Sequence, residues 1–277
     1  MDLQTIETAA KLRRRIFLTA YSGGMAHLAS SFSAVEILYA LYLRGVMNHD
    51  PHDPAKPDRD RFVLSKGHGA LALYAVLCEA GYLTEAELFT YLKPNCHIGG
   101  EPNTRDIAGI EASTGSLGHG LSAGVGMALA QKLDRTGAKT YVLIGDGESQ
   151  EGSIWEAAMS AAALSLDNLI VILDCNSLQK SSRVDDTMGY VHWDEKWRAF
   201  GWNVLSIPGN DVQAIDAALT LAAETKGKPT VIILNTVKGY GSPVMEDKAA
   251  WHHHLPNDEE YAQIIADFAA HKEAING

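Results

Sequence analysis

The stretch Thr140-Tyr141-Val142-Leu143-Ile144-Gly145-Asp146-Gly147-Glu148 decides the fold. Its first five residues are aliphatic, aromatic or β-branched and predict a short buried strand, which the glycines end. The carboxyl end of such a strand, just before a helix, is where open α/β sheets bind their ligands. Glycine lets the backbone approach phosphate oxygens closely, whereas an aspartate there must either hold a cation or repel the phosphate. The stretch therefore predicts a phosphate group that is bound together with a metal ion.

Two further apolar runs, 169–173 and 230–234, repeat the strand pattern. Helical periodicity covers 151–166, between the first two runs, and 211–225, before the third. This alternation predicts the α/β class, with a parallel sheet flanked by helices on both faces.

The first third of the chain differs, because its apolar residues recur at helical spacing near 4–20, 34–44 and 69–80. Residues 48–61 are rich in Pro, Asp and His and predict an exposed connection. We expect a single domain over residues 1–277, in which a helical and loop N-terminal third packs on the parallel core.

Two capping patterns mark shorter elements. Thr84 followed by Glu87 predicts the start of a short helix, which Pro94 would end. Asn257 with Glu260 predicts the start of a final helix.

Composition excludes several function classes. The formal net charge of -11 argues against broad binding to nucleic acid or anionic membranes, which needs a basic face. The basic run 13–15 is interpreted as a solvated helix face. The sequence shows neither a signal-like N-terminus nor a membrane-spanning apolar run, and its three unpaired cysteines predict reduced, mostly buried thiols. These features predict a cytoplasmic protein.

A second polar group belongs to the predicted metal site. Asn176 follows the run 169–173 and would lie at the carboxyl edge of the strand beside the one that ends at Asp146. Two hard oxygen ligands, a nearby backbone carbonyl and diphosphate oxygens would suit Mg²⁺ or Ca²⁺. Gly-Asp-Gly alone is a common turn, but together with this asparagine it is typical of thiamine-diphosphate enzymes. A nucleotide P-loop is a poor alternative, because no Gly-Lys-Ser/Thr follows a glycine loop.

Five segments, which together cover nearly the whole chain, resemble transketolases and predict the diphosphate-binding fold (PP domain) of that family. They are 27–38 (HLASSFSAVEIL), 60–74 (DRFVLSKGHGALALY), 113–127 (STGSLGHGLSAGVGM), 145–157 (GDGESQEGSIWEA) and 238–252 (KGYGSPVMEDKAAWH).

The resemblance implies a role for each matching residue. The metal ion would be held by the side chains of Asp146 and Asn176 and by the carbonyl group of Leu178. The cofactor thiamine diphosphate would be contacted by Asp146, Asn176 and nine more residues: Ser30, His68, Gly115, Ser116, Leu117, Gly147, Glu148, Lys238 and His252.

Three histidines, His27, His68 and His252, would surround the reacting ketose and act as catalytic residues. Cleaving a ketose between its second and third carbons requires removal of a hydroxyl proton near neutral pH, for which imidazole is suited. Lys66 either orders the loop beside His68 or is solvated, and His253 and His254 receive no role.

One position departs from the family. Transketolases usually carry a substrate-contacting histidine in a Gly-His-Pro triplet, whereas this chain has Gly100-Glu101-Pro102. His97 is near in sequence and could substitute, or Glu101 indicates a different donor or acceptor sugar.

The resemblance covers only the diphosphate-binding half of a transketolase. The pyrimidine-binding domain, which carries the glutamate that activates the cofactor, is expected on a partner chain. We therefore expect an α2β2 heterotetramer that transfers a two-carbon ketol unit from an anionic ketose, such as a sugar phosphate, to an aldose. Two alternatives stay open: the thiamine-diphosphate-binding subunit of a 2-oxo acid dehydrogenase or acyloin-forming enzyme, and a non-catalytic paralogue.

Overall fold

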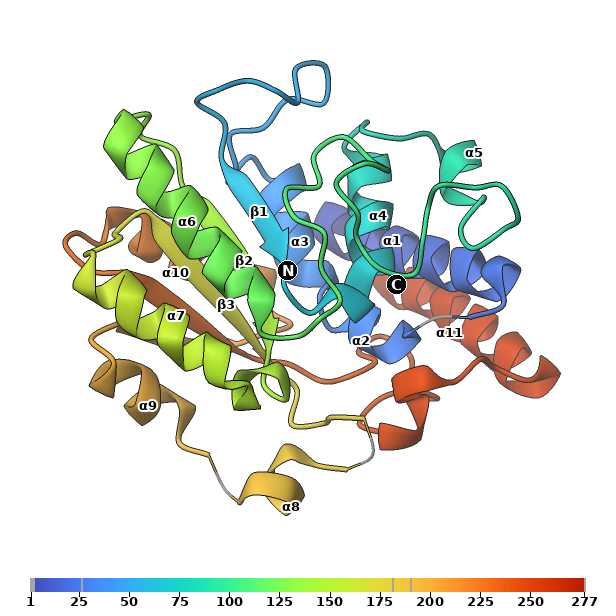
Figure 1. Ribbon diagram of the computed structural model, residues 1–277. Helices are drawn as coiled ribbons and strands as arrows, with labels where there is room; N and C mark the ends of the chain where they lie inside the picture. The colour runs from blue at the N-terminus through green and yellow to red at the C-terminus, as the bar shows by residue number, and fades with distance from the viewer. Residues whose placement is uncertain (1–2, 26, 181, 190, 277) are drawn as a thin grey trace.

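The protein is represented by a computed structural model, which describes residues 3–25, 27–180, 182–189 and 191–276. Its centre is a five-stranded parallel sheet with the strand order β1-β2-β3-β5-β4 (Figure 1). The strands are β1 (Arg61–Leu64), β2 (Thr140–Gly145), β3 (Leu169–Cys175), β4 (Asn203–Pro208) and β5 (Thr230–Asn235). The predicted parallel α/β fold is therefore confirmed.

Helices cover both faces of the sheet, as Figure 1 shows for α6 and α7, which lie side by side across one face. The helices are α1 (Leu3–Gly23), α2 (Leu28–Phe32), α3 (Val35–Leu43), α4 (Ala70–Glu79), α5 (Glu85–Leu88), α6 (His119–Asp134), α7 (Gly152–Ala163), α8 (Val184–Met188), α9 (Trp193–Ala199), α10 (Val212–Glu224) and α11 (Asp258–Asn276).

Alternation along the buried strands divides the core in two. In β3, Ile170 and Ile172 pack with α1 to α4, α10 and α11, whereas Val171 and Leu173 pack with α6, α7 and α9. Successive side chains of a strand point to opposite faces, so a strand that is buried on both sides is apolar at every position. This is why the sequence marks β2, β3 and β5 as continuous apolar runs.

The predicted caps are present. The Thr84 hydroxyl accepts a hydrogen bond from the backbone N–H of Glu87, and the Glu87 carboxylate accepts one from the backbone N–H of Thr84. Asn257 and Glu260 make the same reciprocal pair at α11, at 2.9 Å each. However, α5 ends at Leu88 rather than near Pro94, so the predicted end of that helix was wrong.

The interpretation of 13–15 as a solvated helix face was also wrong for Arg13. This side chain lies at the buried side of α1, where its Nη2 donates to both carboxylate oxygens of Glu36 at 2.6 and 2.8 Å. Its Nε donates to the carbonyl oxygen of Tyr240 at 2.6 Å. A buried guanidinium group needs such a carboxylate partner, because burying an unpaired charge is costly.

Two further predictions concern the whole chain. The three cysteines are free, as expected, but each is half-buried rather than buried. Over the described ranges, no helix combines the length and the apolar character needed to cross a membrane. The cytoplasmic location stays a prediction.

Candidate active site

A cavity of about 380 Å³ lies where the carboxyl ends of β2 and β3 meet the segments before α2, α4 and α6. Nearly all of the site residues predicted from the sequence line it, although they come from six separate segments of the chain. Those that line it are His27, Ser30, His68, Gly115, Leu117, Asp146, Gly147, Glu148, Asn176, Leu178, Lys238 and His252.

The sheet register brings the proposed metal ligands to one place. Gly145 of β2 pairs with Asp174 of β3, so Asp146 and Asn176 follow neighbouring strand ends. The Asp146 carboxylate accepts hydrogen bonds from the backbone N–H groups of Gly147 at 2.8 Å and Ser177 at 2.6 Å. Burial, followed by the nearby charge of Asp174, raises the pKa of Asp146 to about 6. A bound cation would reverse this shift, because it favours the ionised carboxylate.

Asp174 fixes the orientation of the Asn176 amide. The Nδ2 of Asn176 donates to Asp174 at 3.2 Å, so its Oδ1 is directed elsewhere, and the backbone N–H of Leu178 donates to that oxygen at 3.1 Å. An amide held in this way offers oxygen rather than nitrogen to a metal ion.

The charge on Asp174 is balanced by Lys66, whose side chain is 1% exposed. The Lys66 ammonium group donates to Asp174 and, at 3.1 Å, to the carbonyl oxygen of Ser30. Burial alone would raise the pKa of Asp174, but Lys66 and the hydroxyl groups of Thr236 and Ser33 lower it below its ordinary value. Of the two alternatives for Lys66, the ordering of the loop is therefore confirmed.

Lys238 and His252 form a second chain of contacts. The Lys238 ammonium group donates to the carbonyl oxygen of Leu178 at 3.1 Å and lies 2.8 Å from Nδ1 of His252. Burial, followed by the charge of Lys66, lowers the pKa of Lys238 to about 8. The Leu178 carbonyl oxygen thus already faces a positive charge, as a metal ligand would.

Three imidazole rings meet at the cavity. The ring centroids of His27 and His68 are 5.5 Å apart, and His252 lies 5.3 Å from His27 and 5.5 Å from His68. Burial is the main cause that lowers the pKa of His27 to about 4 and of His252 to about 3, and it lowers the pKa of His68 as well. All three rings are therefore neutral near pH 7 and able to accept a proton.

Gly67 and Gly115 bring two backbone segments together, and Gly115 lines the cavity. Gly115 has φ +142, and a Cβ atom at Gly67 would lie 2.7 Å from the Gly115 nitrogen. Glycine at 67 permits this close approach, whereas glycine at 115 permits the positive φ and leaves room for the Glu101 side chain.

Glu148 lines the cavity, but its carboxylate is held by protein donors. Its Oε1 accepts from the Ser65 hydroxyl and from the Gly118 N–H at 2.9 Å, and its Oε2 accepts from the Gly145 N–H at 3.0 Å. This position supports the turns around the site, and contact of Glu148 with a cofactor stays a prediction.

Ser116 is exposed and does not line the cavity. Sequence reasoning did not single out Gln179 and Lys180, which do line it and follow Leu178 directly in the chain. Because they follow the predicted metal ligand Leu178 directly, the sequence could have identified them as candidate site residues. Glu101 lines the cavity, whereas His97 is exposed and does not.

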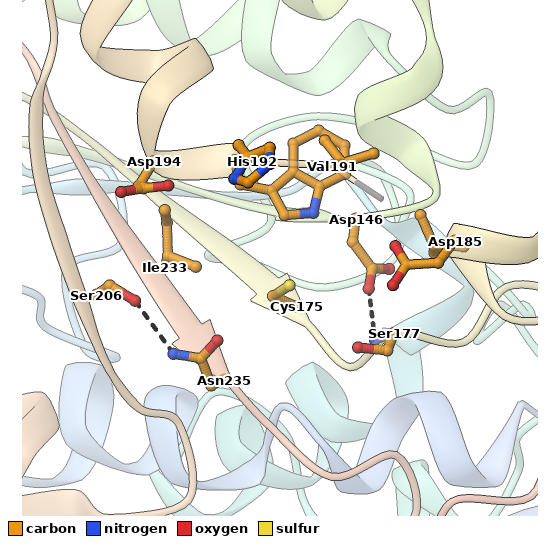
Figure 2. A pocket seen from close by; sticks show the side chains of 12 residues that line it. Asp146, Cys175, Ser177, Asp185, Val191, His192, Asp194, Ser206, Ile233 and Asn235 are labelled. Atoms are coloured by element: carbon orange, nitrogen blue, oxygen red, sulfur yellow. Dashed lines mark hydrogen bonds between the residues drawn. The ribbon is translucent and has the colours of Figure 1, made fainter. Parts of the chain in front are cut away.

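A second cavity of about 240 Å³ shares Asp146 with the first and lies against the ends of β3, β4 and β5. Figure 2 shows Asp146 directed at Ser177, and Asn235 joined to Ser206. It contains none of the histidines of the first cavity.

Comparison with known proteins identifies the family. Residues 17–274 match the family described as "Transketolase, thiamine diphosphate binding domain". The chain belongs to the transketolase family. The resemblance inferred from the sequence motifs is thereby confirmed.

Transketolase relatives of similar length are named as subunits. One of them, a subunit of the apulose-4-phosphate transketolase of Actinobacillus succinogenes, is 44% identical over 262 residues, which are 94% of each chain. Another, "6-deoxy-6-sulfo-D-fructose transketolase subunit SqwG" of a Clostridium species, is 44% identical over 244 residues, which are 88% of each chain.

Solved transketolases share the fold but are longer. The transketolase from Leishmania mexicana superposes with a TM-score of 0.85 and 31% identity, covering 98% of this chain and 43% of that one. The enzyme from Campylobacter jejuni gives 0.86 and 26%, covering 99% and 46%. The chain therefore spans less than half the length of these solved transketolases.

Proposed function

We propose that this chain is the metal- and diphosphate-binding subunit of a split transketolase, which transfers a two-carbon ketol unit from an anionic ketose to an aldose. The observation that carries the proposal is the convergence of three neutral imidazoles on a cavity that also contains a triad of potential oxygen ligands. Oxygen ligands for a metal ion are needed by any site that binds diphosphate through such an ion. Imidazoles that can exchange protons with hydroxyl groups are needed in addition when the substrate is a polyhydroxy compound.

The donor set fits a hard divalent cation such as Mg²⁺ or Ca²⁺. One carboxylate, one amide oxygen and one backbone carbonyl leave positions for diphosphate oxygens, as Mg²⁺ sites commonly do. We assign these ligands to Asp146, Asn176 and Leu178, and the amide of Asn176 already has the required orientation. The glycine turn at Gly115 lines the same cavity, and we place the cofactor ring beside it.

Thiamine diphosphate, when bound, supplies the nucleophile that adds to the ketose carbonyl and the electron sink that makes cleavage of the adjacent carbon–carbon bond possible. The chain's own residues then have to hold the sugar and move its hydroxyl protons. His27, His68 and His252 are close enough to one another to contact a single sugar, and each is neutral at the start. Lys238, beside His252, would face the diphosphate and balance its charge.

A partner chain is part of the proposal. We propose that residues 1–277 form one diphosphate-binding (PP) domain, that the pyrimidine-binding domain with its activating glutamate is on the partner, and that the two chains form an α2β2 heterotetramer. The support is that similar-length relatives are called subunits, and that the chain covers 39% of human transketolase at 40% identity. The names of two relatives contain a sugar phosphate and a sulfosugar, which supports an anionic ketose as donor.

The test is reconstitution with the product of a neighbouring open reading frame that encodes a pyrimidine-binding domain. With thiamine diphosphate and Mg²⁺, we expect ketol transfer from a phosphorylated or sulfonated ketose to an aldose, measured by product mass. Normal turnover by the isolated chain would contradict the split site. Decarboxylation of pyruvate without ketol transfer would favour the 2-oxo acid dehydrogenase alternative, and failure to bind thiamine diphosphate by calorimetry would favour the non-catalytic one.

A further inference from the structure

The loop that carries Glu101 is fixed against the glycine turn of the cavity. The backbone N–H of Thr114 donates to the carbonyl oxygen of Pro102 at 3.1 Å, which holds the two segments together. A Cβ atom at Gly115 would lie 1.7 Å from Oε2 of Glu101. The carboxylate therefore fills the space that any side chain at 115 would occupy, directly on the wall assigned to the cofactor ring.

This carboxylate differs from the other two in the cavity. Asp146 and Glu148 accept hydrogen bonds from backbone or hydroxyl donors of the protein. Glu101 lines the same cavity but is exposed, and it makes no hydrogen bond or ion pair with any residue that the structure describes. Its acceptor oxygens are therefore available to a ligand.

An ionised carboxylate only accepts hydrogen bonds, so its natural partners in a sugar are hydroxyl groups. Juxtaposed like charges are disfavoured, so the same oxygens would oppose a substrate that carries an anion at that point. Both effects act beside Gly115, in the cavity that the three imidazole rings also line.

We propose that Glu101 is a specificity-determining residue, which binds hydroxyl groups at the reacting end of the sugar and excludes donors that are anionic there. The inference rests on the proposed function and refines its substrate class: the anion of the ketose must lie away from the reacting carbons. The chain's departure from the family at this position then changes which donors are accepted.

Two donors that deliver the same ketol unit distinguish hydrogen bonding to sugar hydroxyl groups from repulsion of an anion. One is the preferred ketose, and the other is hydroxypyruvate, which carries a carboxylate on its reacting carbonyl and loses it as carbon dioxide. In the reconstituted complex, E101Q should lower kcat/KM for the ketose about tenfold, because a hydrogen bond to a charged group is lost. For hydroxypyruvate kcat/KM should itself rise, because the repulsion is removed, so its ratio to kcat/KM for the ketose should rise by more than the about tenfold that the loss with the ketose alone would give.

Two variants serve as controls. E101D keeps the charge and should keep the low ratio, whereas D106N removes a carboxylate from the same loop outside the cavity and should leave it unchanged. Thiamine-diphosphate affinity, measured by calorimetry, should stay within about twofold in E101Q.

The outcomes separate the two proposals. A ratio unchanged in E101Q, or a parallel loss of thiamine-diphosphate binding, overturns the role of Glu101 alone. A wild-type complex that transfers no ketol unit from either donor overturns the proposed function and this inference together.

Discussion

Replacing Lys66 with methionine should destabilise the chain by about 3 kcal/mol, because it leaves the charge of Asp174 buried without its cation. Both side chains are 1% exposed, so water cannot replace the lost partner. Methionine is close to the lysine stem in length, which keeps the packing defect small.

The magnitude follows from the donors that remain. Breaking a buried ion pair typically costs 3–5 kcal/mol, in rough terms. Asp174 would keep hydrogen bonds from the Ser33 hydroxyl at 2.7 Å, the Thr236 hydroxyl and the Asn176 amide. These neutral donors place the expected cost at the lower end of that range. D174N alone leaves the Lys66 ammonium group buried without its partner and should also cost about 3 kcal/mol. Removing both charges in K66M/D174N should leave the protein no less stable than K66M, so the coupling energy equals the cost of D174N, about 3 kcal/mol.

Urea unfolding, followed by the fluorescence of the buried Trp197 and Trp202, measures these free energies. The matched control is R198M, which removes a cation from the exposed Arg198–Asp194 pair and should cost less than about 1 kcal/mol. The reasoning is refuted if K66M lies within about 0.5 kcal/mol of wild type, or if the losses of K66M and D174N simply add.

Three further predictions concern other parts of the chain. Asn257→Ala removes the side-chain cap of α11 and should lower the free energy of unfolding in urea by about 1 kcal/mol. An equal loss of stability on replacement of the next residue, Asp258, would contradict this role of Asn257. Gly67→Ala places a Cβ 2.7 Å from the Gly115 nitrogen, which should displace the glycine turn that lines the cavity. Calorimetry should then show at least about tenfold weaker thiamine-diphosphate binding, and unchanged affinity would refute the placement of the cofactor beside Gly115. The His27 ring should titrate by NMR with a pKa of about 4, against the ordinary 6.5, and a midpoint near 6.5 would contradict the burial argument. Between these two pH values the unfolded chain binds more protons than the folded chain. The contribution of His27 to the free energy of unfolding should therefore fall as the pH drops from 6.5 to 4.

The sequence predicts the three inner strands of the sheet and misses the two edge strands, β1 and β4. β2, β3 and β5 read as continuous apolar runs because both of their faces are covered. β1 is a short edge strand, and β4, at the other edge, is half-exposed along its length, so neither has a distinctive pattern. A strand therefore escapes prediction when its apolar run is short, as in β1, or when its burial is partial, as in β4.

Single residues show the same limit within the site. Motif resemblance located Asp146 and Asn176, but whether Lys66 is solvated or buried depends on Asp174, which lies on another strand. The misjudged Arg13 has the same cause, since its partner Glu36 comes from α3. Long-range charge pairing cannot be read from local periodicity, because each partner alone looks like a surface residue.

The charges of the cavity explain why metal and diphosphate should bind together. Burial, followed by the charge of Asp174, raises the pKa of Asp146 to about 6, and burial, followed by the charge of Lys66, lowers the pKa of Lys238 to about 8. A divalent cation beside Asp146 would relieve the first shift, but by itself it would meet the Lys238 ammonium group at the Leu178 carbonyl oxygen. Diphosphate would relieve the second shift, but by itself it would meet the Asp146 carboxylate. Because each ligand removes the charge that opposes the other, their binding free energies should be coupled, with neither ligand bound tightly alone.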